Sequence, residues 1–467
     1  PSRGWYGRMA ADRLTSLVAS FLDVATTSAH MPVGWPARFA PPRDGAAPSF
    51  ERLRDHIACR LWRAPRYRQR LADVPLGLNR PIWVDDEEFD IDRHVRRAPS
   101  DDLAELADTV MSTPLARNRP LWELWIADRL EDGGLGVVGK AHHCMVDGIA
   151  AVELAALLLD PEPDSPPDEP EEWRPASGPG AGGRLFAGLA DRVAEQLDLV
   201  ALPAKLAGSP RRAGGLLRRA GQAFVSSFAP TTPARVLNEP LSPYRRLATA
   251  VRPLEELKQV KRRFGTTLND VVLTVSTGAL AGYLDGRGQE PRRLKTMVPV
   301  NIRADDGAGE LGNRISFLFL DLPCDERDPV RRLRELHAAT KERKERGDPE
   351  GSEAVLELIA HAPSSLQRVV SRLVASPHTF NLVVSNIPGP PEPLYMLGCE
   401  LMEAYPVVPL ADRHTLSIGF TSVCDRACFG LYADRDALPD ADDLAAHLEV
   451  AIEELLDRSR EPDLATV

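Results

Sequence analysis

Two adjacent histidines, His142 and His143, are followed by Asp147 and Gly148 in the segment AHHCMVDG. An imidazole with its ordinary pKa of about 6.5 is mostly neutral at pH 7 and can accept a proton there. Because successive side chains of a strand point to opposite faces, one imidazole is expected to face a cleft and the other the core. The pattern therefore predicts a proton-transfer site with one histidine as general base.

The residues of this segment could also take other roles. Two neighbours on an extended chain diverge and do not easily reach one ion, so we expect no metal. Cys144 next to a histidine could be a nucleophile, but as a strand neighbour it should face the other side. Asp147 could orient the base as the carboxylate of a triad does. Gly148 either permits a tight backbone or simply begins a helix.

The elements around the histidines place them at a junction. Strands are expected at 122–130 and 135–141, joined by a turn with two glycines, and a helix at 147–159. The stretch 160–184 is rich in proline, glycine and acidic residues, which is typical of a linker. The candidate base therefore lies between a strand and a helix, shortly before a linker.

Beyond the linker, the stretch 185–228 combines amphipathic segments with a basic run that carries Lys205, Arg211, Arg212, Arg218 and Arg219. Such a segment can lie on an anionic lipid surface, or it can be a solvated helical bridge between domains. A second unit begins near residue 238. Its expected helices are 253–264, 268–284, 331–346, 352–374 and 440–458, and its expected strands are 294–300, 315–321, 380–386, 415–423 and 429–433.

Strands mixed with helices in both halves predict an α/β, or α+β, sandwich. The expected division is a first lobe at 10–160, a linker with an amphipathic segment at 161–237, and a second lobe at 238–460. A length of 467 residues also favours two domains.

Composition narrows the class of protein. A net charge of −11 argues against a general nucleic-acid binder, whose domains are usually basic. The six cysteines show no CxxC pair or zinc-like spacing, which suits free thiols in a reducing compartment. The start of the sequence does not resemble a signal peptide, and no apolar stretch is long enough to cross a bilayer. We therefore expect a cytoplasmic protein that can also lie on a membrane or lipid-droplet surface.

Five further segments accompany the histidines in order along the chain: PLWE with Trp122, Asn269-Asp270, PVNIR ending at Arg303, GNR at 312–314, and SNIPGP beginning at Ser385-Asn386. Together with HHCMVDG they resemble the bacterial wax ester synthase/diacylglycerol acyltransferase family. The resemblance spans about 14–456 and departs from the family pattern at Val18 and Pro32.

This resemblance implies two chloramphenicol acetyltransferase-like lobes with a substrate tunnel between them. It implies that His143 faces the tunnel as general base, and that Asp147 forms a structural salt bridge, for which Arg303 is the candidate partner. The implied reaction transfers a fatty acyl group from acyl-coenzyme A to diacylglycerol or a long-chain alcohol, in a ternary complex. Acyl-coenzyme A is then a substrate, and no cofactor is expected.

Alternatives within and outside the superfamily stay open. One is a condensation enzyme or acyltransferase that uses a carrier-bound thioester. Another is a non-catalytic lipid-binding protein of lipid-droplet surfaces.

The oxyanion or substrate site and the phosphate-binding site have several candidate residues each. Candidates for the oxyanion or substrate site are Asn269, Asp270, Ser385, Asn386 and Trp122, although each polar one could equally be a cap or turn residue and Trp122 could pack in the core. Candidates for the phosphates of coenzyme A are Lys258, Lys261, Arg262 and Arg263, which could also form a solvated helix face.

Overall fold

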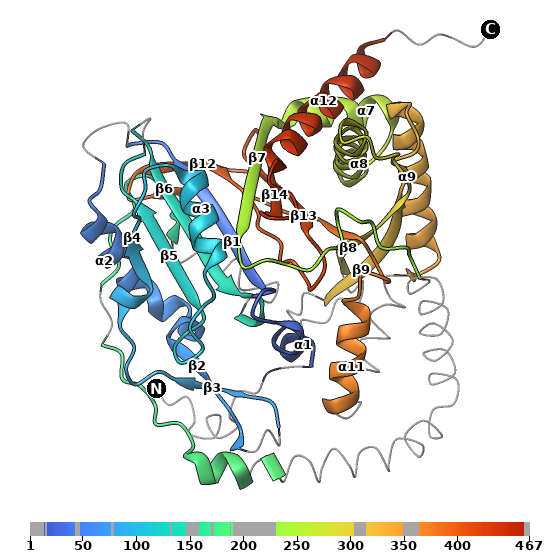
Figure 1. Cartoon of the computed structure of the whole chain (residues 1–467). Helices are drawn as coiled ribbons and strands as arrows, with labels where there is room; N and C mark the ends of the chain where they lie inside the picture. The colour runs from blue at the N-terminus through green and yellow to red at the C-terminus, as the bar shows by residue number, and fades with distance from the viewer. Residues whose placement is uncertain are drawn as a thin grey trace, which may run out of the picture.

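The computed structural model describes residues 14, 16–42, 47–75, 79–130, 133–145, 158–169, 172–186, 188–189, 230–302, 314–348 and 364–461. These residues form two lobes, each built around a six-stranded sheet (Figure 1). The strand order is β11-β12-β1-β6-β5-β4 in the first sheet and β7-β14-β13-β10-β8-β9 in the second. The expected α/β sandwich with two lobes is therefore confirmed.

The strands of the first lobe are β11 (Tyr395–Met396), β12 (Cys399–Ala404), β1 (Pro32–Phe39), β6 (Leu135–His142), β5 (Trp122–Ala127) and β4 (Val95–Arg97), with β2 (Gln69–Ala72) and β3 (Ile82–Asp85) as a separate pair. Those of the second are β7 (Arg245–Pro253), β14 (Arg426–Asp434), β13 (Leu416–Val423), β10 (Leu382–Ile387), β8 (Leu294–Ile302) and β9 (Arg314–Leu322). The helices used below are α1 (Ser16–Val24), α2 (Phe50–Arg60), α3 (Leu103–Ser112), α7 (Leu254–Phe264), α8 (Leu268–Gly286), α9 (Pro329–Glu345), α11 (Ser364–Val374) and α12 (Ala441–Arg460).

Strand β6, which ends at His142, is held by a strand on each side and by a hydrogen bond to α3. It pairs antiparallel with β1 and β5, and all eight of its residues are buried. A Cβ on Gly139 would lie 2.0 Å from the Trp35 ring on β1, so only glycine allows this close approach. The Lys140 ammonium donates a hydrogen bond to the Val110 carbonyl at 2.6 Å, near the end of α3. The histidines therefore follow a rigid element.

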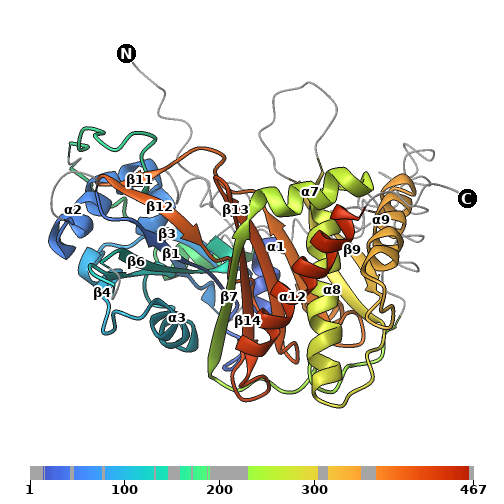
Figure 2. The ribbon, with the colours of Figure 1, turned by 90° about the horizontal axis from the view of Figure 1, so that it is seen from above.

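Four helices, α7, α8, α9 and α12, cover one face of the second sheet (Figure 2). Helix α8 is apolar around nearly its whole circumference and is buried between the sheet, α9 and α12. It starts with a capping box, in which the Thr267 side chain accepts from the Asp270 N–H and the Asp270 carboxylate accepts from the Thr267 N–H. Such caps typically contribute about 1 kcal/mol.

The two sheets do not divide at one point of the sequence. Strands β11 and β12 come from the second half of the chain but extend the first sheet, where β12 pairs antiparallel with β1. Residues 395–404 thus lie in the first lobe, although the linear division expected them in the 238–460 lobe. The physical reason is that β12 covers the edge of β1, which would otherwise expose its backbone groups.

The described part of the expected linker is bound to the first lobe. The buried guanidinium of Arg60 on α2 donates to the Asp160 carboxylate at 2.7 Å and lies 2.9 Å from the Asp168 carboxylate. Arg63 also reaches Asp168, at 2.7 Å. The Trp173 ring lies edge-on to Phe89. This acidic stretch is therefore a strap that two arginines hold against α2.

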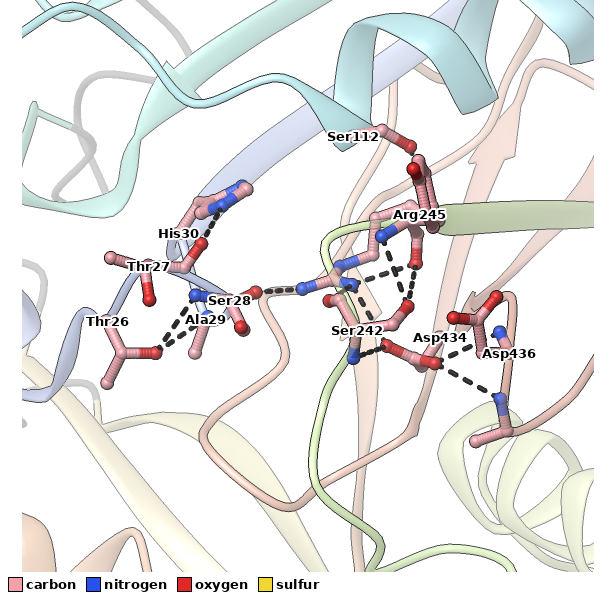
Figure 3. A network of polar contacts seen from close by, with 12 residues as sticks. Thr26, Thr27, Ser28, Ala29, His30, Ser112, Ser242, Arg245, Asp434 and Asp436 are labelled. Atoms are coloured by element: carbon pink, nitrogen blue, oxygen red, sulfur yellow. Dashed lines mark hydrogen bonds and ion pairs between the residues drawn. The ribbon is translucent and has the colours of Figure 1, made fainter.

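A polar network joins the lobes beside the start of β1 (Figure 3). The Arg245 guanidinium on β7 is 2 % exposed and lies 3.1 Å from the buried Asp434 carboxylate. It also donates to the carbonyls of Ser242 at 2.6 Å and of Ser28, a residue of the loop between α1 and β1. The backbone N–H of Arg245 donates to the Ser112 hydroxyl at the end of α3. The loop that precedes β1 is thereby fixed from the opposite lobe.

No helix in the described part of the chain is both long and apolar enough to cross a membrane.

Candidate active site

His142 is the inward-facing member of the histidine pair. It is the last residue of β6, is 4 % exposed, and accepts a hydrogen bond at Nδ1 from the Cys144 N–H at 3.2 Å. Burial, followed by the positive charges of Arg117 and His143, lowers the pKa of His142 to about 3. The ring is therefore neutral near pH 7. Its role is structural, because it accepts a hydrogen bond from the backbone of the turn that follows the strand.

His143 is the outward-facing member. It begins the short 3-10 turn η5 (His143–Met145), and its side chain is half-buried, with Nδ1 enclosed. The imidazole stacks on the Phe21 ring of α1, with centroids 3.7 Å apart and planes 8° apart. One buried and one half-buried imidazole match the predicted division, although His143 lies in the turn after the strand and not in the strand itself.

The backbone of His143 is fixed by Met31, a residue with an uncommon backbone conformation. Its N–H donates to the Met31 carbonyl at 3.0 Å. Met31 is buried and has a φ of +52°, in the left-handed region that a methionine rarely adopts. Non-glycine residues persist there only where the surroundings hold them, and such positions gather at functional sites.

Cys144 does not suit a nucleophilic role. Its side chain is buried, and burial raises the pKa of the thiol to about 12. The reactive form of cysteine is the thiolate, so this thiol is inert near neutral pH.

Several predicted residues lie outside the described residues: Asp147, Gly148, Arg303 and the GNR segment up to Asn313. The expected salt bridge between Asp147 and Arg303 and the expected helix at 147–159 remain predictions. The same holds for most of the basic segment 185–228, of which residues 185–186 and 188–189 are described.

The Asn269-Asp270 pair lies in the first turn of α8. Asp270 is fully buried, and besides its capping role its Oδ2 accepts from the His337 ring at 2.8 Å. This carboxylate is committed to helix structure and cannot donate to an oxyanion when ionised. Asn269 is half-buried and stays a candidate donor.

Ser385 and Asn386 lie in β10, near its carboxyl end, between β13 and β8. Ser385 is buried and Asn386 half-buried. Trp122 belongs to the core: it is 1 % exposed, its indole N–H donates to the Tyr67 carbonyl at 2.7 Å, and its ring stacks on His94.

The four basic candidates for phosphate binding share the helix α7. Lys258, Lys261 and Arg262 are exposed, and Arg263 is half-buried. Arg262 pairs with Glu255 on the same helix, and Arg263 donates to the Glu461 carbonyl at 3.3 Å. Figure 1 shows α7 at the top of the second lobe, whereas α1 lies below, near the gap between the lobes.

Two neighbouring grooves lie where the lobes meet, and Arg38 and Glu403 line both. The larger, of about 360 Å³, is also lined by Pro36, Leu247 and Tyr405. Pro36 and Arg38 lie toward the far end of β1 from Pro32, the residue that pairs with His142. These grooves are therefore distinct from the surroundings of His143, and the expected tunnel beside His143 remains a prediction.

Sequence reasoning missed Phe21 and Met31, two of the residues that contact His143. An apolar residue on an amphipathic helix gives no signal of which ring it will contact, and methionine does not indicate a left-handed backbone. In the described residues, no group of three or more His, Cys, Asp or Glu side chains is placed to hold a metal.

Comparison with known proteins gives a consistent result for both halves of the chain. The wax ester synthase/diacylglycerol acyltransferase catalytic domain matches residues 14–272, and the C-terminal domain of the same family matches residues 311–456. The probable diacylglycerol O-acyltransferase tgs1 of Mycobacterium tuberculosis is 33 % identical over 455 residues, which cover 95 % of this chain and 96 % of the relative.

Solved structures agree. The wax ester synthase/diacylglycerol acyltransferase from Marinobacter aquaeolei has a TM-score of 0.69 and 26 % identity, over 96 % of this chain and 99 % of the other. The trichothecene 15-O-acetyltransferase of Fusarium sporotrichioides, at 12 % identity and a TM-score of 0.61, covers 96 % of this chain and 95 % of its own and shares the fold. The family resemblance in the motifs is thereby confirmed. This chain belongs to the wax ester synthase/diacylglycerol acyltransferase family and is an O-acyltransferase of that type.

Proposed function

We propose that this enzyme transfers a fatty acyl group from acyl-coenzyme A to diacylglycerol or a long-chain alcohol, forming triacylglycerol or wax ester. The observation that carries the proposal is the placement of His143, a half-buried imidazole held by Met31 and Phe21 in a chain related throughout to diacylglycerol O-acyltransferases.

In this proposal Nε2 of His143 is the basic nitrogen, since Nδ1 is enclosed. It withdraws the hydroxyl proton of the acceptor as the oxygen attacks the thioester carbonyl. The tetrahedral intermediate collapses by breaking the carbon–sulfur bond, and the imidazolium returns the proton to the coenzyme A thiolate. No covalent acyl-enzyme forms, so both substrates are bound together. The buried, protonated Cys144 is consistent with this.

Donors for the oxyanion come from the remaining candidates. Asn269, Ser385 and Asn386 carry neutral donor groups and stay in the proposal. Asp270 is withdrawn because its carboxylate caps α8 and binds His337. Trp122 is withdrawn as well, because its ring and its N–H are used in the core. The Asp147–Arg303 pair is kept as the structural salt bridge of the loop.

For the phosphates of coenzyme A, the exposed ammonium groups of Lys258 and Lys261 are the preferred candidates on α7. Arg262 and Arg263 are weaker ones, because Glu255 and the Glu461 carbonyl already bind them.

We also infer that the enzyme works in the cytoplasm at a lipid surface, where its water-insoluble acceptors and products lie. The support is the described start of the basic segment: Phe186 is 76 % exposed and Leu189 is 48 % exposed. Two exposed apolar side chains three positions apart can be buried together in a lipid interface.

The test is a transfer assay with His143→Ala. Thiol release from acyl-coenzyme A in the presence of diacylglycerol or a fatty alcohol is expected to fall by about 10²- to 10⁴-fold, because the proton acceptor is lost. The exposed His378 provides a matched control, since His378→Ala removes an imidazole far from the pair in the sequence and should leave the rate unchanged. Circular dichroism checks that both variants are folded.

Undiminished turnover in folded His143→Ala would contradict the proposal. Lipid mass spectrometry of the products, with mono- and diacylglycerols and fatty alcohols offered side by side, identifies the acceptor class. If the enzyme is inert with free acyl-coenzyme A but active with an acylated carrier protein, the acyl donor is the carrier-bound thioester and not acyl-coenzyme A.

A further inference from the structure

The side chain that faces His143 belongs to the amino-terminal helix α1 rather than to the histidine motif. We infer that Phe21 is a positioning residue: its ring sets the plane of the His143 imidazole and thereby aims the basic nitrogen at the acceptor hydroxyl. This inference rests on the proposed role of His143 as general base.

The geometry is that of a close parallel stack. The ring centroids are 3.7 Å apart and the planes differ by 8°. At this separation one whole face of the imidazole is in van der Waals contact, so rotation of the ring about its Cβ–Cγ bond would drive it into Phe21. The side chain is thus limited to one orientation of its plane.

A stacked ring holds an imidazole without using its nitrogens. Both nitrogens and their lone pair or proton lie in the ring plane, whereas Phe21 covers a face and offers no hydrogen-bonding group. An orienting carbonyl or carboxylate would instead bind one nitrogen directly. Phe21 therefore fixes direction while leaving the in-plane site of proton transfer unobstructed.

Helix α1 is itself held firmly enough to act as a support. It packs against η5 of the first lobe and against α11 of the second, and Ala19 is buried on its inner side. Figure 1 shows α1 beside α11, below the gap between the lobes. The loop that follows α1 is bound through the Ser28 carbonyl to Arg245 (Figure 3).

Two other phenylalanine–histidine stacks show what a purely structural pair looks like. His94 stacks on Phe89 with centroids 5.1 Å apart, and His414 stacks on Phe380 at 4.2 Å. Both of these imidazoles are 1 % exposed and both reach backbone carbonyls through ring nitrogens. The Phe21 stack is tighter and flatter, yet its imidazole is half-buried.

The experiment compares Phe21→Leu, Phe21→Tyr and Phe89→Leu in the full chain. Phe21→Leu keeps the apolar volume but loses the flat face, so kcat is expected to fall by about tenfold to a hundredfold with KM for both substrates little changed. Phe21→Tyr keeps the face and should restore most of kcat. Phe89→Leu removes an equally half-buried partner of a structural histidine and should leave kcat unchanged in the folded fraction.

A second readout does not depend on catalysis. In a chain labelled with ¹³C-histidine, the His143 Cε1–H signal is identified by its loss in His143→Ala. Ring-current shielding by Phe21 should place it upfield of the exposed His378, and Phe21→Leu should move it downfield.

The outcomes separate the two proposals. If folded Phe21→Leu keeps wild-type kcat while His143→Ala is inactive, the positioning role is wrong and the base assignment stands. A His143 signal that Phe21→Leu does not move also overturns the stack in solution. If His143→Ala stays active, the proposed function fails and the positioning role fails with it, even where the signal does move.

Discussion

At the scale of single residues, two neighbouring side chains of the same type behave differently because their surroundings differ. His142 ends a fully buried strand and loses its ability to take up a proton near pH 7, whereas His143, one residue later, has left the strand. The sequence predicted this division from strand alternation alone. It could not predict Phe21 or Met31 as neighbours of His143, because those contacts are made by a helix and a loop more than a hundred residues earlier.

The buried His142 makes stability depend on pH. Its pKa is about 3 in the folded chain and about 6.5 when unfolded, so between these values only the unfolded state binds the proton. Stability is therefore expected to fall as the pH drops below 6.5, with a contribution from this residue of about 2 kcal/mol lost by pH 5.

His142→Gln retains an acceptor for the Cys144 N–H but does not titrate in this range. The free energy of unfolding in urea, measured from pH 7.5 to 5, should decline less steeply in this variant. Burial also lowers the pKa of His56, His94 and His414, and these contributions cancel in the comparison. If the free energy of unfolding has the same pH dependence in both chains, the pKa of His142 is not lowered in the folded state.

At the scale of elements, long periodic segments were the easiest to predict. The expected helix at 268–284 is α8 (Leu268–Gly286), and the expected strand at 415–423 is β13 (Leu416–Val423). Strand β1 was missed although it neighbours β6, because Pro32 and Pro36 argue against a central strand. Tertiary context overrides that preference: the Pro36 carbonyl still accepts from the Tyr405 N–H at 2.8 Å.

The residues that begin the basic segment carry the prediction for lipid binding. Replacing the exposed Phe186 and Leu189 by serine removes apolar area that would enter a lipid interface, so recovery with floated anionic vesicles should fall several-fold. Tyr244→Ser, at another exposed ring of the second lobe, is the matched control and should float as the unchanged chain does. Equal flotation of all three chains would remove the support for a lipid contact at this segment.

At the scale of the whole molecule, the lobes are joined by the hydrogen bonds of a buried arginine as well as by shared strands. Arg245 on β7 reaches the Ser28 carbonyl of the loop before β1, and its charge is balanced within the second lobe by Asp434 on the neighbouring strand β14. Arg245 and Asp434 are both almost fully buried, and the carboxylate also accepts from the Ser242 N–H at 2.7 Å. This pair could not be predicted from the sequence, because its members lie far apart in the chain and neither is in a motif.

Asp434→Ala leaves the Arg245 guanidinium buried without its counter-charge. The free energy of unfolding is expected to fall by about 3–5 kcal/mol, the usual loss when one partner of a buried ion pair is removed. Asp457→Ala, at an exposed pair with Arg460 on α12, should cost far less. Urea denaturation followed by tryptophan fluorescence compares the variants, and equal losses would contradict the importance of burial.

The path of β12 also has a consequence for how the polypeptide is made. During synthesis the first sheet lacks its neighbour on one side of β1 until residue 404 has left the ribosome, after much of the second lobe but before β13, β14 and α12. Through that interval β1 presents unpaired backbone groups, which are open to wrong partners. Nascent chains of this enzyme are thus most vulnerable to aggregation late in translation, and neither half should mature without the other.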